Sequence, residues 1–230
     1  MRAVAEKIKF NADRSKAMII ADAPSLWSIE KRQISGATII YHDGRMLSPN
    51  QRKKIFALSR DISEWWCDTP EYVRAYFTDW FCGDHPEKAE YKDRFSLSPR
   101  DPDVASMTVA KEFITWLIEF CIKWDVPTRK HLREYAEDEG RLFYALLVNR
   151  KCFVCGKGGA DCHHAETRIG MGRDRRKIIH EGMQLMTLCR EHHTECHSAG
   201  QETFNRDHRV FSIKADEHAC RVLGLHCEVS

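Results

Sequence analysis

Apolar and polar residues alternate in short runs over the first 45 positions of the chain. The runs Val4–Phe10, Ala17–Ala21 and Ala37–Tyr41 alternate or are rich in β-branched residues, and the turn-forming pair Asp43-Gly44 follows the last of them. Short runs of this kind between turn signals are typical of strands. The pattern predicts a small antiparallel sheet at the N-terminus.

From Ser48 the apolar period becomes helical. Ser48 can cap a helix that has Pro49 at its first position, and Thr69-Pro70 repeats this start signal. Apolar residues then recur at three- and four-residue spacing. We expect helices over 49–66, 70–80 and 104–124, one or two more between 127 and 149, and a polar, Pro- and Gly-containing loop over 83–103.

A shift in composition at residues 149–151 predicts a domain boundary. Seven of the ten Cys and nine of the twelve His follow residue 150. We therefore expect an α+β protein of two domains. Residues 1–149 would form a mixed sheet-and-helix domain, and residues 150–230 a smaller domain rich in metal-binding side chains.

Composition and charge narrow the class of protein. Apolar residues (43%) can form a core, and charged residues (30%) give an ordinary soluble surface. The sequence has no run of 18 apolar residues and no signal-peptide pattern, which predicts a cytoplasmic protein without a membrane partner. The net charge is only +2, but residues 150–179 carry eight Lys or Arg against three acids. This local cluster either binds phosphate or is a solvated basic loop.

Ten cysteines without a secretion signal favour metal binding over disulfides. Cys152-x-x-Cys155 is a common pair, but Cys189-x-x-His192 repeats its spacing with a second pair of ligands. Together these four residues are a normal Cys3His set for a closed, tetrahedral structural Zn²⁺ site. The alternative is a group of unrelated thiols in a core. The isolated residues Cys67, Cys82 and Cys121 are expected to be ordinary buried thiols.

The remaining histidines of this region suggest a second metal site. His193 and His197 are four residues apart and share a face if residues 189–199 are helical, with Gly200 ending the helix. His192 is turned about 100° from His193 by the helical period. One short helix can therefore present His192 to the zinc site and His193 and His197 to another ion.

The order Cys-x-x-Cys, His-His and Leu-x-x-Leu-Cys-x-x-His-His-x-x-x-His over residues 150–200 resembles the zinc-knuckle branch of the HNH endonuclease family. The resemblance implies a ββα-metal module that hydrolyses phosphodiester bonds in DNA. It implies one active-site divalent cation, Mg²⁺, Mn²⁺, Zn²⁺ or Ni²⁺. His163, His193 and His197 would bind this cation, and His164 would be the catalytic general base.

Two positions depart from the family pattern. Gln184 stands where the family has an Asn that braces the catalytic loop, and Gln can make similar bonds from a longer side chain. His192 replaces the fourth zinc cysteine, which zinc chemistry tolerates. The basic loop between the two halves of the motif is expected to hold the DNA backbone. Its candidate contacts are Arg173, Arg175, Arg176 and Lys177.

The ligand from the first strand is open to an alternative. Adjacent strand residues point to opposite faces, so His163 and His164 reach one site only if the strand twists or ends there. Asp161 is the alternative ligand to His163. The other histidines and cysteines of this region have no matching partners and are expected to be surface or structural residues. They are His180, His208, His218, His226, Cys196, Cys220 and Cys227.

The first domain carries a weaker resemblance. Residues 47–63, from Leu47-Ser48-Pro49-Asn50-Gln51-Arg52 to Asp61-Ile62-Ser63, are similar to phage proteins of the HNH nuclease class. They are distantly similar to the NinB/Orf recombination-mediator family, whose members bind single-stranded DNA as dimers. This resemblance implies a phage protein in the bacterial host cytoplasm, a homodimer, and single-stranded or branched DNA as a partner.

Two main functional hypotheses follow. The first is a metal-dependent DNA endonuclease that acts in recombination or replication. The second is a non-catalytic, single-stranded-DNA-binding recombination mediator that keeps an HNH-like zinc module. A binding module has no use for the four histidines outside the zinc set, so the endonuclease is favoured. A zinc-dependent protein-interaction module would also leave the basic loop unexplained.

Overall fold

The computed structural model describes residues 5–10, 17–21, 45–84, 95–101, 104–165 and 178–227. The chain divides into two compact units, Met1–Tyr41 and His42–Ser230. In the first unit, β1 (Ala5–Phe10) pairs with β2 (Ala17–Ala21) in an antiparallel hairpin. The predicted N-terminal antiparallel pair is thus confirmed, whereas the strand expected at 37–41 lies outside the described residues.

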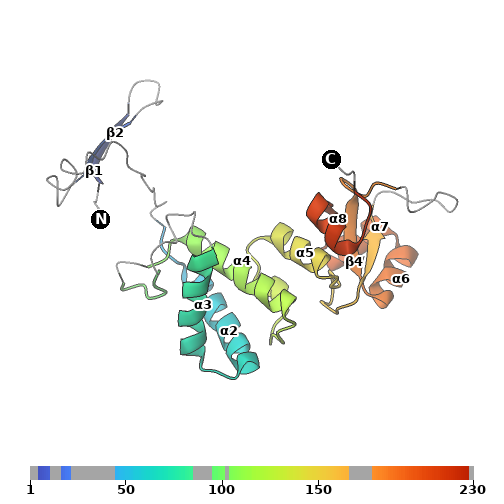
Figure 1. The fold of residues 1–230 in the computed structure, drawn as a ribbon, viewed down its shortest axis with the longest axis horizontal. Coiled ribbons are helices and arrows are strands. Elements are labelled where there is room, and N and C mark those ends of the chain that lie inside the picture. The colour runs from blue at the N-terminus through green and yellow to red at the C-terminus, as the bar shows by residue number, and fades with distance from the viewer. Residues whose placement is uncertain are drawn as a thin grey trace. The chain divides into compact units, whose positions relative to one another are not determined.

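Three long helices open the second unit (Figure 1). They are α2 (Pro49–Trp66), α3 (Pro70–Asp84) and α4 (Met107–Lys123). Ser48 caps α2 as predicted: its Oγ accepts a hydrogen bond from the Gln51 N–H at 3.1 Å, and the Gln51 side chain accepts one from the Ser48 N–H. This capping box satisfies two amides that the helix start leaves without partners. Ser106 is the N-cap of α4. This helix therefore begins at Met107, three residues after the start predicted at Val104.

The helical core is largely aromatic. Phe77 and Phe81 of α3 and Phe113 of α4 are almost completely buried, and their rings meet edge-to-face or tilted partners across the helix contacts. Trp65 and Trp66 at the end of α2 are 39% exposed and lie at the edge of this core. One expectation needs correction. Cys67 is exposed, because it occupies the left-handed C-cap position of α2, with φ 60°.

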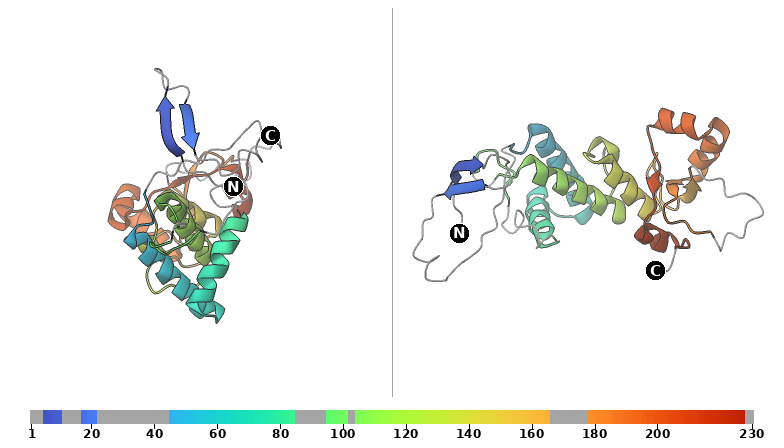
Figure 2. Two further views of the ribbon diagram at one scale, coloured as in Figure 1. Left: turned by 90° about the vertical axis from the view of Figure 1, so that its left-hand side faces the viewer. Right: turned by 90° about the horizontal axis from the view of Figure 1, so that it is seen from above.

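Helix α5 (Glu139–Val148) joins the helices to the C-terminal sheet, after a short 3-10 turn, η2 (Leu132–Glu134). One side of α5 packs against α4. Its other side packs against the C-terminal sheet and the last helix of the chain (Figures 1 and 2). Its Phe143 ring stacks on Phe153 with centroids 4.9 Å apart. The boundary at residue 149 stays a prediction.

The C-terminal sheet has three antiparallel strands in the order β3-β4-β5. Helices α6 and α7 follow β4, separated only by Gly200, and α8 follows β5. The strands are β3 (Asp161–His164), β4 (Gln184–Leu188) and β5 (Ile213–Lys214), and the helices are α6 (Arg190–Ala199), α7 (Gln201–His208) and α8 (Glu217–Leu223). The mixture of helices with a small antiparallel sheet agrees with the predicted α+β class. The sequence pattern did not predict α8. Among the described residues, no helix is long and apolar enough to cross a membrane.

The central strand β4 is tied to the start of the Cys-x-x-Cys segment by a buried hydroxyl. Thr187 is fully buried, and its Oγ1 donates a hydrogen bond to the carbonyl oxygen of Lys151 at 2.6 Å. The Phe153 N–H donates in return to the Thr187 carbonyl at 2.9 Å. These two bonds hold the start of the Cys-x-x-Cys segment against β4.

We predict that Thr187→Val destabilises the protein by about 1–3 kcal/mol, because it leaves the buried Lys151 carbonyl with one acceptor bond fewer while keeping the side-chain shape. The matched control is Thr194→Val on the exposed side of α6, where water replaces the lost bond. It should change the free energy of unfolding by less than about 0.5 kcal/mol. Urea unfolding measures both, and equal effects of the two variants would contradict the role assigned to Thr187.

Candidate metal centres on helix α6

The Cys-x-x-Cys segment forms a tight turn that directs both thiols to one point. The Gly156 N–H donates to the Cys152 carbonyl at 2.8 Å, and the Cys152 N–H donates to the Lys157 carbonyl at 2.9 Å. Gly156 has φ 71°, a left-handed conformation that residues with a side chain rarely adopt. The sequence Cys-Gly-Lys-Gly-Gly thus bends the backbone around the position between the two sulfurs.

This turn faces the N-terminus of α6. The Sγ of Cys155 lies 3.8 Å from that of Cys189, the N-cap residue, and His192 Nδ1 lies 3.5 Å from Cys152 Sγ and 3.1 Å from Cys189 Sγ. One donor atom from each of the four residues lies within 4.8 Å of the others. Tetrahedral zinc, with Zn–S bonds of about 2.3 Å and Zn–N bonds of about 2.0 Å, requires S–S separations of about 3.8 Å and S–N separations of about 3.5 Å. The Cys3His cluster therefore fits zinc in both chemistry and size.

The thiol at the helix start already favours its metal-binding form. Burial raises the pKa of Cys189, but the backbone N–H of His192 and the side chains of His192, Cys152 and Cys155 outweigh it and lower the pKa to about 7. Burial instead raises the pKa of Cys155 to about 11. Cys189 is thus the thiol of this pair that most readily supplies a thiolate near neutral pH.

A second cluster gathers three histidines, His163 from β3 and His193 and His197 from α6. Their ring centroids are 4.8 to 5.1 Å apart, and one nitrogen from each ring lies within 4.8 Å of the other two. His163 is buried, His193 is half-buried and His197 is exposed. The cluster is therefore closed on the sheet side and open to solvent on the helix side, as a site that admits a ligand must be.

The strand register explains why His163 and not His164 joins this cluster. His163 lies opposite Met186 and His164 opposite Leu185 across the antiparallel pair. The sulfur of Met186 accepts a hydrogen bond from Gln201, which shows that Met186 lies on the side of the sheet that faces α7. Adjacent strand residues point to opposite faces, so His164 lies on the other face of the sheet. There its ring lies 5.2 Å from that of His180.

His163 is held by a residue that the sequence motif did not indicate. The Oε1 of Gln201 lies 2.7 Å from His163 Nε2, and Gln201 Nε2 donates to Asn205 Oδ1 at 2.8 Å. A bond of this kind fixes the orientation and tautomer of a metal-binding imidazole. Gln201 begins α7, and the preceding Gly200, with φ 85° and ψ 147°, breaks the helical path from α6. No helical spacing in the sequence therefore points to Gln201.

Two more side chains border the histidine cluster. Asp161, the alternative ligand to His163, lies beside it with its Oδ2 3.7 Å from His193 Nδ1. The buried thiol of Cys196, which the motif left without a partner, lies 3.7 Å from His163 Nε2. Burial lowers the pKa of His163 and also that of His193, and repulsion from neighbouring histidines adds to both shifts. Both imidazoles are therefore neutral near pH 7, the form that binds metal.

Other predicted site residues are not part of either cluster. Gln184 begins β4, and its carbonyl accepts the Ala165 N–H at 2.9 Å, so its backbone supports the end of β3. His180, which the motif left without a partner, is buried beside His164. The predicted DNA contacts Arg173, Arg175, Arg176 and Lys177 lie outside the described residues.

We predict that the purified chain retains a zinc ion that Cys152→Ser loses, because a hydroxyl replaces a buried thiolate ligand. The variant should also unfold at a lower temperature, since a structural zinc supplies folding free energy. Cys227→Ser, outside both clusters, is the control and should keep the parent's zinc content. Metal analysis by mass spectrometry decides, and equal zinc in both variants would contradict the Cys3His assignment.

We predict that Gln201→Leu weakens binding of Mn²⁺ or Co²⁺ at the three-histidine cluster by about 10- to 100-fold, the usual effect of removing a side chain that orients a metal ligand. Glu202→Leu, one residue along α7 and exposed, should bind these ions as the parent does. Calorimetric titration of the zinc-loaded protein measures both affinities. If Gln201→Leu binds like the control, Gln201 does not orient His163.

Comparison with known proteins assigns the sequence that forms these clusters to a family. The sequence profile of a family described as "Putative HNHc nuclease" matches residues 21–226, which include both clusters and most of the helical part. No curated protein and no solved structure matches the chain. Because the profile covers far more than half of the chain, the protein belongs to this HNH nuclease family.

Proposed function

We propose that the protein is a metal-dependent DNA endonuclease. The observation that carries the proposal is the division of labour on α6, which presents His192 to a Cys3His cluster and, one residue on, His193 and His197 to a separate, open cluster with His163. A module that only bound DNA would need the first cluster for its stability but would have no use for the second. Membership of an HNH nuclease family supports the same reaction class.

The two clusters would hold ions with different tasks. Zinc in the Cys3His cluster would join the Cys-x-x-Cys turn to the start of α6. His163, His193 and His197 would bind one divalent cation, Mg²⁺, Mn²⁺, Zn²⁺ or Ni²⁺. When bound, a cation of this kind stabilises the negative charge that develops on a phosphodiester during hydrolysis.

His164 is our candidate general base. It is the last residue of β3 and is half-buried, with its Nε2 covered by protein, so the attacking water would have to approach its other ring nitrogen. A neutral imidazole there would take a proton from the water that attacks phosphorus. His180 packs against it at 5.2 Å between ring centroids and would restrict its orientation. The carbonyl of Gln184 would support the same strand end through its bond from Ala165.

The cellular role is proposed from sequence likeness. Arg173, Arg175, Arg176 and Lys177 would hold the flanking DNA backbone. The segment 47–63, similar to phage proteins and distantly to the NinB/Orf family, supports a phage enzyme of recombination or replication. Such an enzyme would work in the host cytoplasm on single-stranded or branched DNA, with a homodimer as its expected form.

We predict that the parent chain cuts DNA in the presence of a divalent cation, whereas His197→Ala and His164→Ala each reduce the rate by at least about 100-fold. His218→Ala, an exposed histidine of α8 outside both clusters, should retain the parent's rate. The assay is a panel of Mg²⁺, Mn²⁺, Zn²⁺ and Ni²⁺ against duplex, single-stranded, forked and four-way-junction DNA. Failure of the parent to cut any of these would instead favour the non-catalytic recombination mediator.

A further inference from the structure

A second basic surface lies on the outer face of α2, away from the histidine cluster. The segment from Arg45 to Arg60 contains five Lys or Arg and no Asp or Glu, in a chain whose net charge is only +2. Side chains of α2 and the start of α3 line a hollow here. Its lining residues, which we call the α2 basic pocket, are Arg52, Lys53, Phe56, Ala57, Arg60, Pro70 and Arg74.

An aromatic ring organises the cations of this pocket. The guanidinium carbons of Arg52 and Arg74 lie 4.5 and 4.2 Å from the centroid of the Phe56 ring. Cation–π attraction at these distances holds both groups beside the ring. The Nε of Arg52 also donates to the Leu97 carbonyl at 3.0 Å. Two long side chains that usually move freely are thus fixed before any ligand arrives.

The charges of the pocket are only partly neutralised. Arg74 pairs with Glu71 at 2.7 Å, and Arg60 lies 3.4 Å from Asp61. Within the described residues, neither Arg52 nor Lys53 has an ion-pair partner. The opposite side of α2 differs, because Lys54 there is paired with Glu137 at 3.1 Å. The excess positive charge is therefore confined to the pocket side.

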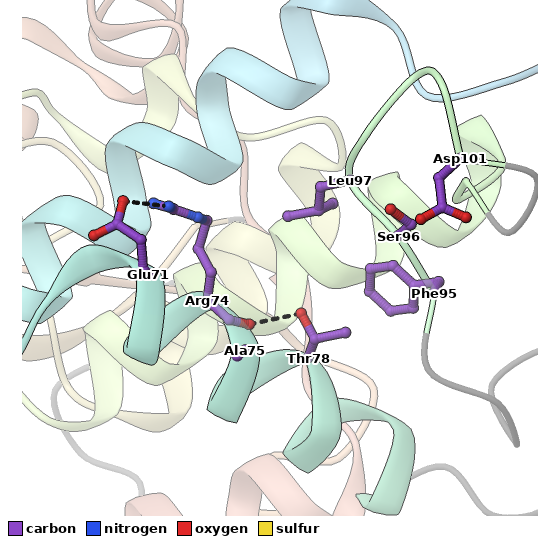
Figure 3. Close-up of a pocket in the computed structure, with 8 residues that line it drawn as sticks. All are labelled: Glu71, Arg74, Ala75, Thr78, Phe95, Ser96, Leu97 and Asp101. Atoms are coloured by element: carbon purple, nitrogen blue, oxygen red, sulfur yellow. Dashed lines mark hydrogen bonds and ion pairs between the residues drawn. The ribbon is translucent and has the colours of Figure 1, made fainter.

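A neighbouring hollow, on the other side of Arg74, differs from the α2 basic pocket in charge. Figure 3 shows Arg74 extending from α3 with its guanidinium turned toward Glu71, while Asp101 and Ser96 lie at the far end of that hollow. An anion would meet carboxylates there but would meet mainly cations on the α2 side. Arg74 separates the two environments, so the α2 basic pocket is the one suited to a negatively charged ligand.

We propose that the α2 basic pocket binds the sugar-phosphate backbone of a nucleic acid. Positions 52 to 60 of α2 span about 12 Å at the helical rise of about 1.5 Å per residue. Cations placed along a helix match the repeated charges of a polynucleotide, which recur about every 3.4 Å of helix axis on each strand of a duplex. This proposal rests on the endonuclease function, because a substrate longer than the cleavage site needs further backbone contacts.

The test uses the full chain carrying His164→Ala, so that DNA stays intact, with fluorescence anisotropy of labelled single-stranded DNA over a series of salt concentrations. The pair Lys53→Gln and Arg60→Gln should weaken binding about fivefold or more at low salt. It should also reduce the slope of log affinity against log salt by about 1.4, about 0.7 for each lost contact to a single strand. The matched control is Lys123→Gln with Lys130→Gln, which removes the same charge elsewhere and should change affinity less than about twofold.

Lys53→Glu alone guards against misfolding of the double variant, because Lys53 is exposed and has no partner among the described residues. It should weaken binding while keeping the parent's melting temperature. Affinity and slope like those of the control pair would overturn the proposal. Tighter binding of the parent to anionic phospholipid vesicles than to DNA, lost in Lys53→Glu, would also overturn it and indicate a membrane surface.

The outcome is separable from that of the endonuclease proposal. If the parent cuts no DNA but Lys53→Glu still loses binding, the α2 basic pocket stands and the catalytic proposal fails. If the parent cuts DNA and the pocket variants bind like the parent, the reverse holds.

Discussion

The contact between the Cys-x-x-Cys turn and the first turn of α6 determines the geometry of both Cys/His clusters in the C-terminal module. Cys189 caps the helix and His192 lies one turn later, so their joint approach to Cys152 and Cys155 fixes the rotation of α6 about its own axis. Once that rotation is fixed, the helical period leaves no freedom for His193 and His197. They must face β3, where His163 is already held by its strand register.

The sheet imposes a second constraint, because the pleat of β3 separates His163 from His164. A short strand can place one of two adjacent histidines against α6, and the other then belongs to the opposite face. The register assigns His163 to the helix side and His164 to the side of His180. A base and a metal ligand from adjacent residues can therefore act on one phosphate only at the end of the strand, and β3 ends at His164.

Much of the site could be predicted from sequence because local spacing encodes it. The Cys3His cluster and the pairing of His193 with His197 follow from Cys-x-x-Cys, Cys-x-x-His and the four-residue interval, whereas His163 came from the family resemblance, with Asp161 as the alternative. What spacing cannot encode is the support from distant segments. The bond between Gln201 and His163 depends on the direction that α7 takes after Gly200, whose φ of 85° and ψ of 147° end the helical path of α6. His180 reaches His164 only through the tertiary fold.

The same reasoning applies to the helices. Ser48 and Pro49 predict the start of α2 correctly, because caps and proline act within one turn. Burial of the aromatic residues was less predictable. A periodic pattern indicates which side of a helix is apolar, but not whether the last turn extends past its neighbours. Trp66 and Cys67 lie at such an end, and both remain exposed.

Helix α5 links the two halves of the second unit through opposite sides of ten residues. Arg141 pairs with Glu119 of α4, while Phe143 stacks on Phe153 beside the Cys-x-x-Cys turn. Excising the nuclease module at residue 150 would therefore strip an apolar cover from the sheet that supports His163. We would therefore expect a transferable form of this module to include α5 rather than to begin at residue 150.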